Sequence, residues 1–185
     1  SGEDQLIVAT RQGMAIRFNE TDARVLGRTA RGVRALNLEE DDIVVGMVPV
    51  MENTTVLTVS ENGQGRRTDP AEYRLQSRGG KGIKNYDTQK NGPVAGVLAV
   101  GEEDDVILIS DDGIIIRIPV AEISTQSRYA GGVRVMRIGE GSRLVSLCRA
   151  PHEDEEEAAA ESEAPAEAEA PAEENADSTE TPVEE

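Results

Sequence analysis

The feature that most constrains the fold is an internal repeat with a period of fifty residues. Glycines recur at positions 13, 63 and 113, and again at positions 32, 82 and 132. Aligning the chain with itself at this period makes three stretches equivalent: RTARGVRAL, SRGGKGIKNY and SRYAGGVRVM. Self-similarity at a fixed period of this length is typical of propellers, solenoids and other repeat arrays.

Each repeat has the pattern of a β-sheet. A short apolar run ends at Gln12-Gly13, Asn62-Gly63 or Asp112-Gly113, and Asn-Gly and Asp-Gly accept the positive φ angles of two-residue hairpins. A second strand (MAIRF, QGRRT, IIIRI), a third (GVRAL, GIKNY, GVRVM) and a fourth (IVVGMVPV, PVAGVLAV, RLVSLC) follow. Four short strands per repeat suit a propeller blade. We therefore predict an all-β, propeller-like fold of three four-stranded blades at residues 1–50, 51–100 and 101–150.

The charge of the chain is concentrated in its last part. The 185 residues have a formal net charge of −17, and residues 151–185 hold 15 acidic residues and no Lys or Arg. The first 150 residues therefore balance 19 basic against 21 acidic residues. A tail of Glu, Ala, Pro and Ser cannot bury enough surface to offset the entropy of ordering, so we predict disorder for residues 151–185. Such a tail either competes with phosphates for the basic residues of the body or only aids solubility.

Several classes of protein are excluded by composition. Cys148 is the only cysteine and His152 the only histidine, which excludes a disulfide framework and a Cys/His zinc cluster. One reduced cysteine and no long apolar run favour a cytoplasmic protein without a membrane partner. The first residue is Ser, so we expect the chain to be part of a longer protein.

Basic residues recur at fixed positions of the repeat. Three columns of the self-alignment are basic in every copy: Arg17, Arg67 and Arg117; Arg28, Arg78 and Arg128; and Arg34, Lys84 and Arg134. Repeated blades would arrange these cations along a curved rim that duplex DNA can follow, with contacts to phosphates that carry no sequence information. The alternative is an inherited surface on which, for example, Arg17 pairs locally with the acidic column of Asp22, Glu72 and Glu122.

The middle repeat carries the strongest candidate for such contacts. In the stretch RGGKG, Gly79, Gly80 and Gly82 alternate with Arg78 and Lys81, and glycine lets backbone N–H groups approach a phosphate. The spacing does not fit a nucleotide-binding P-loop. This repeat also contains Arg66 beside Arg67, and it is the only repeat with a positive net charge. We therefore add Arg66 to the predicted DNA-binding residues.

The stretch QSRGGKG, residues 76–82, resembles the box motif QRRGGKG of the DNA gyrase A C-terminal domain. Six of its seven residues match, and Ser77 replaces an arginine. Flanking stretches are similar throughout residues 1–150, and the acidic tail is similar in character. In that family the full box lies in the first blade, whereas the three repeats of this chain resemble the last three blades.

The resemblance implies a six-bladed β-pinwheel that wraps double-stranded DNA around a basic rim without sequence specificity. The domain would work with the gyrase A core and with gyrase B in an A2B2 holoenzyme of the bacterial nucleoid, which introduces negative supercoils. ATP and Mg would bind to other domains or subunits, and no cofactor is expected in this chain. The related subunit of topoisomerase IV has a similar domain and is an alternative.

Two other functions remain open at the level of sequence. A protein-interaction propeller of kelch or chromatin-regulator type would bind no nucleic acid, although kelch repeats use a Trp and this chain has none. An enzyme in its own right is disfavoured, because the one histidine lies at the start of the tail and no metal cluster or cleavage-type tyrosine motif is present. Tyr86 shares a column with Leu36 and Met136, so we expect it in the core.

Overall fold

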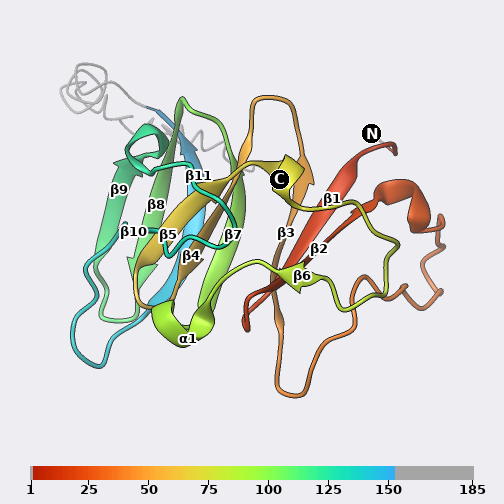
Figure 1. The fold of residues 1–185 in the computed structure, drawn as a ribbon, viewed down its shortest axis with the longest axis horizontal. Coiled ribbons are helices and arrows are strands. Elements are labelled where there is room, and N and C mark those ends of the chain that lie inside the picture. The colour runs from red at the N-terminus through yellow and green to blue at the C-terminus, as the bar shows by residue number, and fades with distance from the viewer. Residues whose placement is uncertain (1, 153–185) are drawn as a thin grey trace, which may run out of the picture. The chain divides into compact units, whose positions relative to one another are not determined.

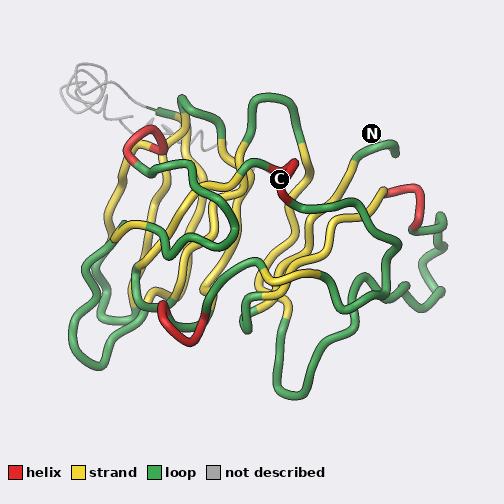
Figure 2. The backbone as a smooth tube through the Cα atoms, in the orientation of Figure 1, coloured by secondary structure: helices red, strands yellow, loops and turns green. Residues whose placement is uncertain are grey.

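The structure, a computed structural model, describes residues 2–152, and these form three antiparallel sheets (Figures 1 and 2). Sheet 1 has the order β3 (Val44–Val50), β1 (Gln5–Thr10), β2 (Met14–Asn19), β6 (Ile83–Lys84). Sheet 2 has the order β7 (Val94–Val100), β4 (Thr55–Ser60), β5 (Gln64–Thr68), β10 (Val133–Arg134). Sheet 3 has the order β11 (Leu144–Pro151), β8 (Asp104–Ser110), β9 (Ile115–Pro119). The predicted disordered tail lies outside the described residues, except for its first two positions.

Short helices join the strands. A 3-10 turn follows the second strand of each repeat, at η1 (Glu20–Asp22), η2 (Pro70–Glu72) and η3 (Val120–Glu122), and the single α-helix of the described residues is α1 (Thr88–Asn91). No helix in the described part of the chain is long and apolar enough to cross a membrane. The prediction of an all-β fold with three sheets is confirmed.

The predicted hairpin turns are present in all three repeats. Gly13, Gly63 and Gly113 have φ angles of 86°, 76° and 85°, the region that favours glycine. The hydroxyl that precedes the turn helps to close it, since the N–H of Met14 donates to Oγ1 of Thr10 at 3.2 Å. The turn chemistry read from the sequence therefore sets the geometry of each hairpin.

The outermost strand of a sheet comes from the following repeat. Strand β6 of the second repeat pairs with β2 of the first, with Ile83 opposite Ala15 (Figure 1), and β10 of the third repeat pairs with β5 of the second, with Val133 opposite Gly65. The structure thus differs from the predicted blades, in which each repeat supplied all four strands of its own sheet. Residues 32–36 form no strand, and sheet 3 has three strands, because no described residue completes either pairing.

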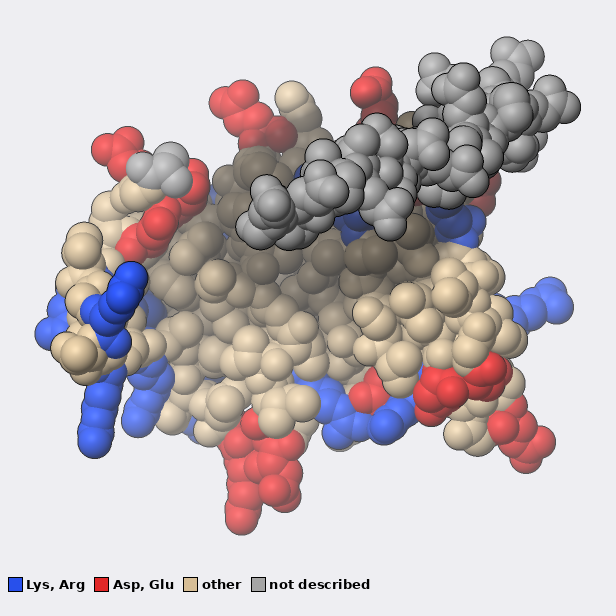
Figure 3. Space-filling model, turned by 180° about the vertical axis from the view of Figure 1, so that it is seen from behind, with Lys and Arg blue, Asp and Glu red and all other residues tan. Residues whose placement is uncertain are grey.

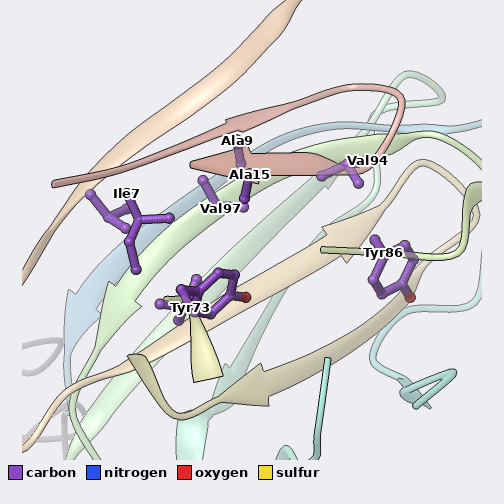
Figure 4. Packing of buried hydrophobic residues seen from close by; sticks show 9 residues of the cluster. Ile7, Ala9, Ala15, Tyr73, Tyr86, Val94 and Val97 are labelled. Carbon is purple, nitrogen blue, oxygen red and sulfur yellow. The ribbon is translucent and has the colours of Figure 1, made fainter. Parts of the chain in front are cut away.

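The sheets stack through apolar clusters. One cluster joins sheets 1 and 2 and includes Ile7, Ala15, Tyr73, Tyr86 and Val97 (Figure 4). A second cluster joins sheets 2 and 3 through β4, β8 and η3. Burial of these side chains is the main force that holds successive sheets together.

One edge of each sheet lies against its neighbours and the other lies outside. Strand β3 packs against β7, and β7 packs against β11. A Cβ atom on Gly46 would lie 2.8 Å from Cγ2 of Val97, and one on Gly96 would lie 2.4 Å from Cδ2 of Leu147. Since β3, β7 and β11 are the inner strands, β6 and β10 are the outermost ones. We call β6 and β10, with the loops that lead into them, the rim.

Candidate nucleic-acid interface

Arg17 and Arg67 of the first basic column point into the joints between repeats. Nη1 of Arg17 donates to the carbonyl oxygens of Pro70 at 2.6 Å and Tyr73 at 3.2 Å. Nε of Arg67 donates to the carbonyl oxygen of Ile123 at 2.5 Å. Each of these arginines therefore ties a sheet to the 3-10 turn of the next repeat.

Arg67 is also buried, and both Arg67 and Arg117 pair with carboxylates. Arg67 is 5% exposed, and its Nη1 lies 2.5 Å from Oε2 of Glu102. The hydrogen bond from Arg67 lowers the pKa of Glu102. Nε of Arg117 lies 2.7 Å from Oδ2 of Asp105, and its Nη2 donates to the carbonyl oxygen of Pro151. For Arg17 and Arg67 these positions correct the sequence prediction, because a guanidinium that holds carbonyl groups within a joint is not free to contact phosphate, whereas Arg117 is exposed.

The second column fastens each repeat to the one before it. Nε of Arg78 donates to the carbonyl oxygen of Asp22 at 2.8 Å, and Nη1 donates to that of Arg34 at 3.1 Å. Arg128 repeats this arrangement fifty residues later, with donation to the carbonyl oxygens of Glu72 and Lys84. We call Arg17, Arg67, Arg78 and Arg128 the joint arginines. Arg28, the remaining member of the second column, is exposed and binds no described residue.

Glycines of the box stretch allow the backbones of successive repeats to pack closely. Gly82 has a φ of 76°, and a Cβ atom on it would lie 2.4 Å from the carbonyl oxygen of Ala15. A Cβ atom on Gly132, the equivalent glycine of the third repeat, would lie 2.5 Å from the carbonyl oxygen of Gly65. The N–H of Gly79 donates to the carbonyl oxygen of Ala35 at 2.6 Å. These glycines are therefore explained by close backbone contact, and only Gly80 and Lys81 form an exposed tip.

The third column, Arg34, Lys84 and Arg134, points outward. Lys84 lies on β6 and Arg134 on β10, the outermost strands. The side chain of Lys84 is 57% exposed with its Nζ 3.4 Å from Oδ1 of Asp87, and that of Lys81 is 75% exposed with its Nζ 3.8 Å from Oε1 of Glu39. Exposed ion pairs of this kind contribute little to stability, so a phosphate can replace the carboxylate. We call Arg34, Lys81, Lys84 and Arg134 the rim cations.

Acidic side chains separate the basic ones on the surface. On the face shown in Figure 3, lysine and arginine lie along the edges of the molecule and acidic side chains project between them. This face therefore has separate basic sites rather than one continuous basic surface. This distribution agrees with the nearly balanced charge of the first 150 residues.

Arg66 is buried, in contrast to the prediction that it contacts DNA. It is 0% exposed, its Nε donates to the carbonyl oxygen of Ser127 at 2.9 Å, and its guanidinium lies 4.9 Å from the ring centre of Tyr86. Burial lowers the pKa of Arg66, although an arginine stays protonated at neutral pH. Tyr86, 1% exposed, is in the core as predicted.

Two residues near the rim were missed by the sequence reading. Arg137 lines a shallow hollow together with Arg134, and Tyr129 is 76% exposed with its ring stacked on the guanidinium of Arg128, 4.8 Å from the ring centre. Neither belongs to a column with the same residue type in all repeats. Only the position of each beside a basic column could have indicated them.

The sequence match decides the family. The family model described as the DNA gyrase C-terminal domain, a β-propeller, matches residues 4–51, 54–100 and 104–147. The chain belongs to this gyrase C-terminal domain family. The DNA gyrase A protein of Aminobacterium colombiense is 46% identical over 66 residues, and that of Haloquadratum walsbyi is 48% identical over 67 residues. These alignments cover 36% and 35% of this chain and 8% of each relative, so the chain spans a small part of the relatives' length.

Solved structures of the gyrase family and its relatives have the same fold. The C-terminal domain of DNA gyrase A superposes with a TM-score of 0.73 at 32% identity, covering 80% of this chain and 50% of that one. The C-terminal domain of DNA topoisomerase IV superposes with a TM-score of 0.76 at 23% identity, covering 87% and 51%. The predicted resemblance to the gyrase C-terminal domain is therefore confirmed.

Proposed function

We propose that this gyrase-family domain binds duplex DNA along its rim and bends it, without sequence specificity. The observation that carries the proposal is the outward position of Arg34, Lys84 and Arg134 at equivalent points of successive repeats. Their side chains have at most weak partners on the described surface. Cations in this arrangement suit a phosphate backbone, whose binding releases counterions and depends on salt.

The joint arginines would set the spacing of the rim cations. Arg78 binds the carbonyl oxygen of Arg34, and Arg128 binds the carbonyl oxygen of Lys84. Each guanidinium thus holds the backbone of a residue whose own side chain faces outward. Pre-positioned cations lose less conformational freedom when they bind a rigid duplex. The inward columns therefore support DNA binding without direct contact.

In a longer protein, this domain would serve a type IIA topoisomerase. DNA bent on the rim would be presented to the cleavage core of gyrase A, and ATP-driven strand passage with gyrase B in an A2B2 assembly would introduce negative supercoils. The family match and the relatives named as DNA gyrase support this role. Catalysis, ATP and Mg would belong to other regions, in the cytoplasm of a bacterium at the nucleoid.

The test is a binding titration of long linear duplex DNA with two charge-matched double variants. Lys84→Ala with Arg134→Ala removes two rim cations, and Arg143→Ala with Arg149→Ala removes two exposed cations at the inner strand β11 and its preceding turn. We expect the rim variant to weaken binding by about tenfold or more and the control to change it little. Equal losses in both variants would show a general charge effect, and absence of binding by the wild type at low salt would favour a protein-interaction propeller.

A further inference from the structure

Tyr129 is the only exposed tyrosine among the described residues. It is 76% exposed, whereas Tyr73 and Tyr86, the other two tyrosines of the chain, are 0% and 1% exposed. It lies on the rim, in the loop that leads into β10. The equivalent residues of the other repeats are Thr29 and Gly79, so the fold of a repeat does not require a ring at this position. Tyrosine is enriched at binding interfaces, and an exposed ring that packing does not need is therefore a candidate for contact with a partner.

The buried Arg66 holds the loop that carries Tyr129. Its Nε donates to the carbonyl oxygen of Ser127 at 2.9 Å, and its Nη2 donates to that of Arg128 at 2.8 Å. In the first repeat the equivalent residue is Ile16, whose side chain has no hydrogen-bond donor. The loop of the third repeat therefore has an anchor that the equivalent loop of the second repeat lacks.

Arg128 fixes the same loop through a second set of hydrogen bonds. Its N–H donates to Oε2 of Glu72 at 2.9 Å, its Nε donates to the carbonyl oxygen of Glu72 at 3.0 Å, and its Nη1 donates to that of Lys84. Its guanidinium lies 4.8 Å from the ring centre of Tyr129. The ring thus rests on a cation that is bound to the backbone of a rim residue. A side chain that is already ordered loses little conformational freedom when it binds a partner.

The hydroxyl of Tyr129 has a proton left to donate. Its Oη accepts a hydrogen bond from Nη2 of Arg128 at 3.1 Å, and no described residue accepts its O–H. Hydrogen bonds in a chain polarise one another, so a bond from a cation makes this hydroxyl a stronger donor. Tyrosine hydroxyls donate to phosphate oxygens in complexes of proteins with DNA. The partner that suits this side chain therefore offers an anionic acceptor beside an apolar surface.

We propose that Tyr129 contacts the sugar-phosphate backbone of duplex DNA, with its ring against a deoxyribose and its hydroxyl donating to a phosphate oxygen. Arg66 is the positioning residue, because it holds the loop without reaching the surface. This inference rests on the proposed binding of DNA to the rim and adds an uncharged contact to it. A neutral hydroxyl releases no counterion, so its contribution to affinity does not depend on salt as that of a cation does.

The first experiment uses this difference in salt dependence. Long linear duplex DNA is titrated at several salt concentrations with the wild type, Tyr129→Ala and Tyr129→Phe. We expect Tyr129→Ala to weaken binding by about tenfold at every salt concentration, because a hydrogen bond to a charged group is lost, and to leave the salt slope unchanged. Tyr129→Phe keeps the ring and should lose less. Met47→Ala, at an exposed position of the inner strand β3, is the matched control and should bind like the wild type.

The second experiment observes the side chain directly. The protein is labelled with 3-fluorotyrosine, which gives three fluorine NMR signals for the three tyrosines, and Tyr129→Phe identifies the signal of Tyr129 by its loss. We expect a short DNA duplex to shift this signal and to leave those of Tyr73 and Tyr86 in place, because both rings are buried. A signal of Tyr129 that does not move when DNA is bound would contradict the contact.

A double-mutant cycle tests the positioning role of Arg66. Arg66→Ile introduces the residue of the other repeats, and we expect it to weaken DNA binding about as much as Tyr129→Ala does, although Arg66 is buried. The variant with both changes should bind no more weakly than either single variant, because the two residues act through one contact. Circular dichroism checks the fold, and Arg66→Lys replaces Arg66→Ile in the cycle if the latter unfolds. Additive losses would show that Arg66 does not act through Tyr129.

The outcomes separate this inference from the proposed function. If Tyr129→Ala binds DNA as tightly as the wild type while the variant with Lys84→Ala and Arg134→Ala has a shallower salt slope, only the inference is overturned. A shallower slope for Tyr129→Ala itself would show the loss of a cation contact and would also contradict it. Absence of DNA binding by the wild type would overturn both.

Discussion

The joints and the rim use arginine and lysine with equal regularity but for different purposes. Arg67 is 5% exposed and binds a backbone carbonyl group across a joint, whereas the side chain of Lys84 is 57% exposed on the outermost strand. Both belong to columns that are basic in every repeat. A column of like charge therefore shows that each repeat needs the cation, but the sheet that covers it decides whether the cation stabilises the joint or faces solvent.

The largest effect should come from removing a joint arginine. Arg67→Ala would leave the carbonyl group of Ile123 without its donor and would create a cavity between sheets 2 and 3, so we expect the free energy of unfolding to fall by about 2–4 kcal/mol. Lys84→Ala should change it by less than about 0.5 kcal/mol. Urea unfolding followed by circular dichroism measures both. Similar losses in the two variants would remove the distinction between joint and rim.

The next effect concerns the glycines of the box stretch. In Gly82→Ala the added methyl group would lie 2.4 Å from the carbonyl oxygen of Ala15 at a positive φ, and we expect a loss of about 1–3 kcal/mol in thermal unfolding. Gly80→Ala is the matched control, because its nearest neighbour would be 3.8 Å away. If Gly80→Ala destabilised the protein as much, close packing would not explain the difference between the two glycines.

A smaller effect should appear on acidification. Burial would raise the pKa of Asp105, but hydrogen bonds from His152 and Arg117 outweigh it and keep the pKa below its ordinary value. This contribution to stability is fully present above the unfolded pKa and is lost as the pH falls through the lowered folded pKa. We expect Asp105→Asn to flatten the decline of the melting temperature in this acidic range. If the melting temperature of the variant declined as steeply as that of the wild type, other carboxylates would cause the loss of stability.

Much of the fold could be predicted from the sequence, because its signals are local. The glycine turns and the alternation of the hairpin strands depend on neighbouring residues, and the shared column of Leu36, Tyr86 and Met136 indicated the core position of Tyr86. The pairing of β6 and β10 with the sheet of the preceding repeat could not be predicted. A two-residue strand carries too little pattern to show which sheet edge it joins.

The direction in which the arginine side chains point also could not be predicted from the sequence. Arg66 and Arg67 are adjacent on β5 and point to opposite faces, yet both are buried because neighbouring repeats cover the two faces. At the position of Arg66 the other repeats have Ile16 and Ile116. These apolar residues agree with a buried position, but they do not show from sequence alone that an arginine is buried there. Repetition showed which residues each joint needs, and the structure showed where they point.

The salt dependence of DNA binding tests most directly the claim that the rim, and not the joints, contacts phosphate. For the wild type and for the variant with Lys84→Ala and Arg134→Ala, the logarithm of the association constant is plotted against the logarithm of salt concentration. Loss of two phosphate contacts predicts a slope shallower by about 1.8. An unchanged slope would contradict the account, because these two cations would then contact no phosphate.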